Sequence, residues 1–297
     1  MITTRRERQG EAKMFLNLAP DRVEIKLELD ELIGLAARHG FAGIDLPLQQ
    51  VATMPDPDTV ACKMRAAGLR WGGFELPLDF RRDQATYDRQ FERLKKWVVI
   101  AERLRCDRCY SSAVPGHNEQ DYRANFRHHA SRLQPVVQLL AAHGIRLGME
   151  FIGLKTLRET FRYPFIHTIN GMLELCEAIA PSSQPGMVGV LLDCYHWWTS
   201  GATEADLLEL LSNEKIVYVH VNDGRAGRSR DEQLDLERTL PCETGLIDSA
   251  AFVRALKTLG YDGPITAEPF DAEMKGKTPD LIAARVAASI HKMIAFA

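Results

Sequence analysis

Short apolar runs alternate with longer segments of helical period along most of the chain. The short runs predict strands at residues 15–19, 42–47, 71–77, 108–112, 146–152, 189–195, 217–222 and 265–269. Between them, apolar residues recur at spacings of three and four, as they do on the buried face of a helix. Four of these helical segments end at a glycine just before the next strand, at Gly40, Gly68, Gly144 and Gly260. Eight repeated strand–helix units predict an α/β fold of the (β/α)8 or TIM barrel type.

A doubly wound parallel sheet is the competing fold for such a pattern. It would usually carry a glycine-rich fingerprint after its first strand, but here that strand is followed by APDRVEIKLELD. Neither GxGxxG nor GxxxxGK occurs in the sequence, so the usual nucleotide signals are missing. We therefore expect one barrel domain over residues 14–297, preceded by a polar, unpatterned leader at residues 1–13 whose conformation is frayed.

Composition narrows the classes of partner. The chain of 297 residues is 45% hydrophobic and 26% charged, which is enough for a large core. Its formal net charge of −3 offers no basic field for a nucleic acid. No apolar run approaches the roughly 20 residues of a membrane span, and no secretory signal opens the sequence. Six scattered cysteines, including the CxxC pair Cys106 and Cys109, are interpreted as reduced and structural. A cytoplasmic protein without nucleic-acid or membrane partners is expected.

Candidate chemistry gathers at the ends of four consecutive predicted strands. Glu150 lies in GMEFIG, Asp193 in LLDCYHWW, His220 in VYVHVND and Glu268 in ITAEPF. The carboxyl ends of barrel strands face the active site. Each residue also has a structural reading on its own: Glu150 as an ion-paired carboxylate, Asp193 as a helix cap, His220 as a core histidine and Glu268 as a strand end.

The four residues together favour a metal site, because buried carboxylates are costly unless they are paired or bind a cation. Three oxygen ligands and one nitrogen suit one divalent ion, whether Mn²⁺, Mg²⁺, Co²⁺ or Zn²⁺, and leave positions for substrate oxygens. The ligand set does not distinguish among these ions.

These motifs, taken in order, resemble the xylose-isomerase-like TIM barrels. MEF, LDxxHWW, HVND and AEPF carry the resemblance, which is clearest over residues 145–270. That superfamily includes sugar isomerases, ketose 3-epimerases, inosose isomerases and dehydratases, and endonucleases of abasic DNA. The resemblance implies that Glu150, Asp193, His220 and Glu268 are the metal ligands, and that Glu150 and Glu268 are the catalytic base and acid.

Substrate-binding residues follow from the same resemblance. It implies that His196 contacts substrate oxygens near the carbonyl. Arg225 is a candidate cation in the loop after His220, although the epimerases carry their arginine one position later. Lys155 is a candidate for a substrate hydroxyl or carboxylate, against the alternative of a solvated loop lysine. A glutamate of the epimerases is replaced here by Thr156.

The expected activity is proton abstraction next to a carbonyl of a ketose or keto-sugar, by a metal-dependent isomerase or epimerase. The alternative is a lyase that dehydrates a keto-inositol or cleaves a 3-keto-glycoside after the same first step. An abasic-site nuclease is disfavoured, because strands three and four, WGGFELP and CYSSAVP, lack histidines and no DxH follows His220. A non-catalytic metal-stabilised barrel is also considered, but an open ligand set argues against a structural site. The partner is a small-molecule sugar, and a homo-oligomer is left open.

Overall fold

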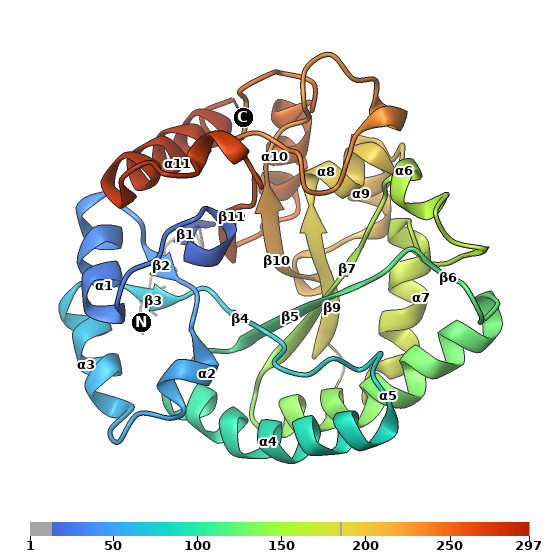
Figure 1. The fold of residues 1–297 in the computed structure, drawn as a ribbon, viewed down its shortest axis with the longest axis horizontal. Coiled ribbons are helices and arrows are strands. Elements are labelled where there is room, and N and C mark those ends of the chain that lie inside the picture. The colour runs from blue at the N-terminus through green and yellow to red at the C-terminus, as the bar shows by residue number, and fades with distance from the viewer. Residues whose placement is uncertain (1–13, 185, 297) are drawn as a thin grey trace, which may run out of the picture.

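A computed structural model describes residues 14–184 and 186–296. Parallel strands surround a common axis, and helices cover them on the outside (Figure 1). The strands are β1 Phe15–Leu18, β2 Gly43–Ile44, β3 Arg70–Trp71, β4 Phe74–Glu75, β5 Arg108–Ala113, β7 Arg146–Phe151, β9 Val188–Asp193, β10 Ile216–Val221 and β11 Pro264–Ala267. The predicted leader at residues 1–13 lies outside the described residues.

The sheet is one closed barrel whose third strand is interrupted. Its order is β3-β2-β1-β11-β10-β9-β7-β5-β4, so its two outermost members, β3 and β4, are separated in sequence by only Gly72 and Gly73. A side chain at Gly72 would collide with Asn17 inside the barrel. The backbone N–H of Leu46 also donates to the carbonyl of Gly73 at 2.8 Å, which links the second strand across the gap. Eight strand positions therefore close the ring, and the predicted TIM barrel is confirmed.

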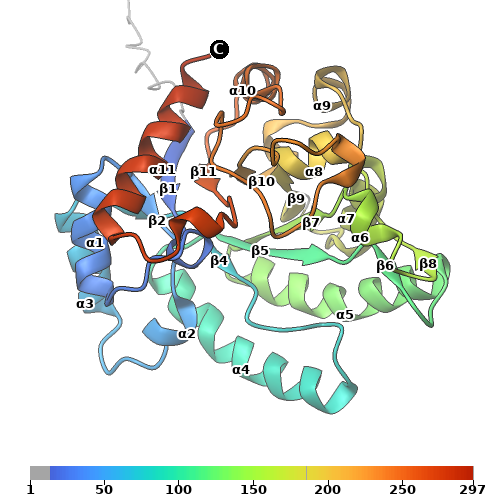
Figure 2. The same cartoon turned by 45° about the horizontal axis from the view of Figure 1, so that its top comes forward.

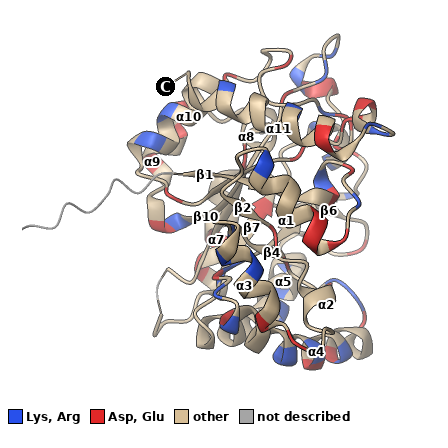
Figure 3. Ribbon diagram, turned by 90° about the vertical axis from the view of Figure 1, so that its left-hand side faces the viewer, with Lys and Arg blue, Asp and Glu red and all other residues tan. Residues whose placement is uncertain are grey.

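The outer helices have the bounds α1 Leu29–Arg38, α3 Asp58–Ala66, α4 Gln84–Arg103, α5 Tyr122–Ala142, α7 Ile169–Ile179, α9 Glu204–Leu210, α10 Ser249–Thr258 and α11 Pro279–Ile294. Each matches a predicted helical segment. The four glycines predicted to end helices all have positive φ, between 67° and 74°. Charged residues of both signs lie mainly on these helices and on the loops (Figure 3). No described helix is both long and apolar enough to cross a membrane.

Loops at the carboxyl ends of the strands carry the shorter elements. These are the helices α2 Leu48–Val51, α6 Lys155–Arg158 and α8 Cys194–Thr199, and a ribbon of β6 Gly116–His117 and β8 Tyr163–Pro164. Single 3-10 turns occur at Pro20–Arg22, Asn213–Lys215, Arg230–Glu232 and Ala272–Met274. The tilted view separates this ribbon and α6 from the barrel strands (Figure 2).

A polar layer crosses the barrel interior beside the first strands. Asp45, which follows β2, accepts hydrogen bonds from Asn17 Nδ2 at 2.8 Å, Tyr218 OH at 2.7 Å and Tyr110 OH at 2.7 Å. Asp45 is buried, and burial raises the pKa of its carboxyl, although these three donors oppose the shift. Each oxygen of this carboxylate therefore has a protein donor. We interpret Asp45 as a structural residue of the barrel interior.

Candidate metal centre

Four side chains from consecutive strands of the sheet converge at one end of the barrel. Glu150 lies on β7, Asp193 ends β9, His220 lies on β10 and Glu268 directly follows β11. Each offers one ligand atom, and these atoms all lie within 4.8 Å of one another. All four residues are buried. The β9–β10 register, in which His220 is the partner of Asp193, places two of them side by side.

Several polar atoms of this cluster lack protein partners. Glu150 Oε1 and both ring nitrogens of His220 are buried and accept or donate no hydrogen bond among the described residues. His220 Nδ1 lies 3.5 Å from Glu150 Oε1 and 3.3 Å from Glu268 Oε2, but neither contact has hydrogen-bond geometry. Buried polar atoms are seldom left unpaired. Carboxylate oxygens and an imidazole nitrogen are ordinary ligands of divalent ions, so the donor set fits a metal.

The surroundings raise the pKa values of two groups in the cluster. Burial raises the pKa of Glu150 to about 7, and the neighbouring Glu268 carboxylate adds to the shift. Burial would lower the pKa of His220, but the carboxylates of Glu268 and Glu150 outweigh it and raise the value to about 10. These shifts reflect several negative groups in one buried place, a strain that a bound cation would relieve.

Asp193 caps a helix in addition to lying in the cluster. Its Oδ1 accepts from the backbone N–H of Tyr195 at 2.7 Å and so caps α8. Asn222 Nδ2 also donates to Oδ1, at 3.1 Å. The helix-capping reading of this residue and its place in the cluster are therefore compatible.

Arg238 is the main residue of the site that the sequence did not single out. It lies on the long loop after β10, and its side chain is only 2% exposed. Nη1 donates to Asp193 Oδ2 at 2.7 Å and to Glu268 Oε2 at 3.0 Å. Nη2 donates to Asp235 Oδ1 at 2.8 Å. The loop holds arginines at 225, 228, 230 and 238. The resemblance pointed to Arg225, but the fold of the loop turns Arg238 toward the cluster.

His196, on α8, also lies beside Arg238. Its Nε2 is 3.1 Å from Arg238 Nη2, and because a guanidinium can only donate, Nε2 must accept. Burial, assisted by the positive charge of Arg238, lowers the pKa of His196 to about 3. The ring is therefore neutral at ordinary pH.

The other two predicted substrate residues lie farther out. Arg225 Nη1 is 3.8 Å from Asp271 Oδ1, and Lys155 Nζ is 3.2 Å from Asp231 Oδ2. Neither residue lines the chamber around the cluster. Thr156, at the position where the epimerases carry a glutamate, donates its hydroxyl to the carbonyl of Gln233 at 2.6 Å.

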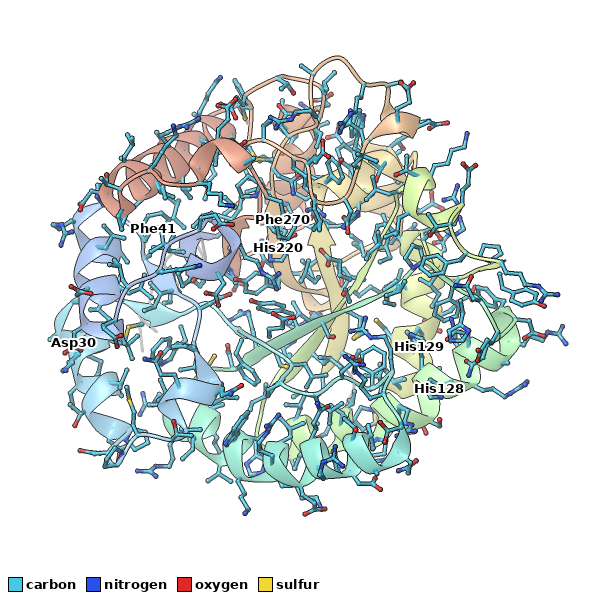
Figure 4. All side chains as sticks on the ribbon, viewed as in Figure 1. Asp30, Phe41, His128, His129, His220 and Phe270 are labelled. Atoms are coloured by element: carbon cyan, nitrogen blue, oxygen red, sulfur yellow. The ribbon has the colours of Figure 1, made fainter. Side chains whose placement is uncertain are left out.

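The chamber around the cluster has a volume of about 170 Å³. His220 and Phe270, which both line it, lie near the middle of the molecule in Figure 4. Phe270 has a φ of 45°, an uncommon conformation for a residue with a side chain. The guanidinium of Arg238 lies 5.1 Å from its ring centroid. Aromatic and charged groups thus share one small space.

A parallel barrel with a buried carboxylate–histidine cluster at its strand ends defines the class: a β/α barrel with a candidate site for one divalent metal. The chain belongs to the xylose isomerase-like TIM barrel family, whose model matches residues 33–292. The family resemblance drawn from the motifs is thereby confirmed.

Individual relatives agree with this assignment. A xylose isomerase domain protein from Alicyclobacillus acidocaldarius subsp. acidocaldarius is similar at 30% identity and a TM-score of 0.84, over 95% of this chain and 99% of that one. An inosose isomerase of Halalkalibacterium halodurans is 26% identical over 197 residues, which are 65% of this chain. That match spans 63% of the relative's length.

Two further solved structures share the fold at lower identity. The IolI protein, solved with a bound zinc atom, has a TM-score of 0.79 at 16% identity, over 95% of this chain and 98% of that one. An L-ribulose 3-epimerase has a TM-score of 0.68 at 19% identity, over 95% of both chains.

Proposed function

We propose that the protein is a divalent-metal-dependent sugar isomerase or epimerase that moves a proton next to the carbonyl of a ketose or keto-sugar. The observation that carries the proposal is the pair Glu150 and Glu268 within one buried cluster, both within 3.5 Å of His220 Nδ1. Two carboxylates whose environments differ suit a general acid and a general base. The relative named an inosose isomerase supports an isomerase.

Glu150, Asp193, His220 and Glu268 would hold the ion. When bound, a divalent ion supplies Lewis-acid stabilisation of the negative charge that develops on the substrate oxygens. Glu150 and Glu268 remove a proton from the carbon beside the carbonyl and return one. Arg238 holds the Glu268 and Asp193 carboxylates, and His196, kept neutral, accepts a hydrogen bond from a substrate hydroxyl whenever Arg238 releases its Nε2.

The test is exchange of a sugar's α-proton with solvent. Protein loaded in turn with Mn²⁺, Mg²⁺, Co²⁺ and Zn²⁺ is incubated with a panel of ketoses and inososes in D2O, and deuterium incorporation is followed by NMR. We expect incorporation with at least one metal and none after chelation. No incorporation under any condition would refute the proposal.

Elimination begins with the same proton removal, so the products separate it from isomerisation. Elimination remains the second candidate because of Thr156. The hydroxyl of Thr156 donates to the Gln233 carbonyl, and this residue provides no carboxylate where the epimerases carry a glutamate. An isomeric sugar of unchanged mass supports the first candidate, whereas an unsaturated product, detected by its ultraviolet absorbance, supports the lyase.

A further inference from the structure

A second, larger cleft opens beside the chamber of the metal cluster. It has a volume of about 620 Å³ and is formed by the loops after the first three strand positions. Arg22, Glu75 and Tyr110 line both spaces, so the two are contiguous. Ligand sites usually measure about 300–1,000 Å³. The chamber of about 170 Å³ falls below this range, and the outer cleft falls within it.

An ion pair stands at the boundary between the two spaces. Arg22 Nη2 is 2.9 Å from Glu75 Oε2, and Arg22 Nε is 3.4 Å from Glu268 Oε1. The Arg22 side chain is 23% exposed and that of Glu75 is 65% exposed, so the pair lies toward the solvent side. Arg22 thereby joins the outer cleft to one of the two proposed acid–base residues.

The charge of the outer cleft argues against an anionic ligand. Arg22 is its single basic lining residue in the described part of the chain, and two carboxylates already meet that charge. The other ionisable carboxylates that line it are Asp21 and Asp45. A phosphate or carboxylate group entering here would face negative charge without a free cation.

The remaining lining suits an uncharged, hydroxyl-rich ring. Gln49 and Gln50 on α2 are exposed, and their side-chain amides make no hydrogen bond to other described residues. Each amide offers both donors and an acceptor. The apolar part of the lining consists of Leu46, Pro47, Leu48, Leu76, Pro77 and Tyr110. Free amides beside an apolar wall can bind hydroxyl groups at a ring's edge and pack against its C–H face.

We propose that the outer cleft is a second sugar subsite, and that the substrate is an uncharged keto-sugar carrying a further polyhydroxylated ring. The reacting ring occupies the chamber of the metal cluster, and the second ring occupies the cleft beside Gln49 and Gln50. This inference rests on the proposed function, since that function assigns the reacting ring to the chamber.

Binding measured by calorimetry tests the subsite apart from turnover. Mn²⁺-loaded protein is titrated with fructose, with fructose 6-phosphate, and with the glucosyl-fructoses turanose, maltulose and isomaltulose, which differ in their linkage. We expect at least one glucosyl-fructose to bind about tenfold more tightly than fructose, a difference of ~1.4 kcal/mol, and the phosphate to gain nothing.

Two variants locate the effect. Gln50→Trp fills the cleft, and it should remove the preference for the glucosyl-fructose while fructose binds as before. Gln184→Trp places the same side chain on an exposed position of the loop between α7 and β9, at the opposite end of the barrel, and should keep the preference.

Three outcomes would overturn the subsite: equal binding of fructose and all three glucosyl-fructoses, a preference that survives Gln50→Trp, or tighter binding of the phosphate. Failure of the proposed function is seen separately. If the glucosyl-fructose preference is present and is lost in Gln50→Trp, but no α-proton exchanges in D2O, the cleft is supported and the proposed chemistry is rejected.

Discussion

Asp45 and Glu150 are both buried carboxylates near the ends of barrel strands, yet their surroundings are opposite. Asp45, in the first half of the barrel, accepts three hydrogen bonds from Asn17, Tyr110 and Tyr218. Glu150, in the second half, has an oxygen with no donor, and it faces His220 and Glu268. Burial raises the pKa of both groups.

The difference separates a candidate ligand from a carboxylate that the protein interior satisfies. Protein donors satisfy both oxygens of Asp45, whereas Glu150 keeps a buried oxygen without a donor beside other carboxylates, where a cation would stabilise it. Both residues are buried carboxylates near the end of a strand, and they differ in how completely the protein satisfies their oxygens.

The largest expected effect on turnover comes from substitutions in the cluster of Glu150 and Glu268. Glu150→Gln and Glu268→Gln each keep the size of the side chain but remove its charge and its ability to take up a proton. Turnover should fall by about 10²–10⁴-fold, as for loss of a general acid or base. Metal content, measured by mass spectrometry after dialysis, should fall as well. Activity within a few-fold of the wild type in either variant would break the proposed pair.

A comparison of two arginines should give the next largest effect. Arg238→Lys removes the planar fork that joins Asp193, Glu268 and Asp235, and kcat/KM should fall on the order of tenfold to a hundredfold. Arg225→Lys is the matched control, because Arg225 lies 3.8 Å from Asp271 and does not line the chamber. A larger loss in Arg225→Lys would return the substrate-binding role to Arg225, as the motif resemblance implies.

Asp45→Asn tests whether the hydrogen-bonded Asp45 contributes to stability and not to metal binding. The substitution places an amide donor among Asn17, Tyr110 and Tyr218, and the free energy of unfolding should fall by about 1–3 kcal/mol. Mn²⁺ affinity, measured by calorimetry, should stay near the wild-type value because Asp45 is not in the cluster. Loss of metal binding with an unchanged circular dichroism spectrum would mean that metal binding at the cluster depends on Asp45.

The smallest effect extends the comparison to the histidines. His129 on α5 has an unpartnered Nε2 like His220, but it lies among the rings of Phe80 and Phe165 rather than among carboxylates. Figure 4 shows it on the outer helix layer, away from His220. Burial lowers the pKa of His129 from the usual 6.5 to about 4. Since the unfolded chain takes up this proton first, the stabilisation is complete above about pH 6.5 and is lost as the pH falls toward about 4.

Chemical denaturation at several pH values measures the contribution of His129 to the free energy of unfolding. The free energy of unfolding should fall by about 1 kcal/mol more in the wild type than in His129→Phe between about pH 7 and about pH 5.5. His129→Phe keeps an aromatic ring against Phe80 and Phe165. Parallel pH curves for the two proteins would show that His129 does not titrate in this range.

The sequence by itself determined the order of the elements and the level of the cluster. Apolar runs separated by amphipathic segments that end at glycine can pack only as repeated strand–helix units, and parallel strands bring their carboxyl ends together. Glu150, Asp193, His220 and Glu268 could therefore be placed at one end of the barrel from their strand positions alone. The role of each one as a ligand stays a prediction.

Tertiary structure alone decided which side chains complete the site. Arg238 is one of four arginines in an irregular loop, where no period relates sequence position to direction, and so its turn into the cluster could not be read from spacing. The break at Gly72 and Gly73, the Arg22–Glu75 boundary and the outer cleft arise between segments distant along the chain. The local sequence pattern predicts which face of a helix or strand a residue occupies. Whether a buried polar atom finds a hydrogen-bond partner depends on all the residues that the closed barrel brings near it.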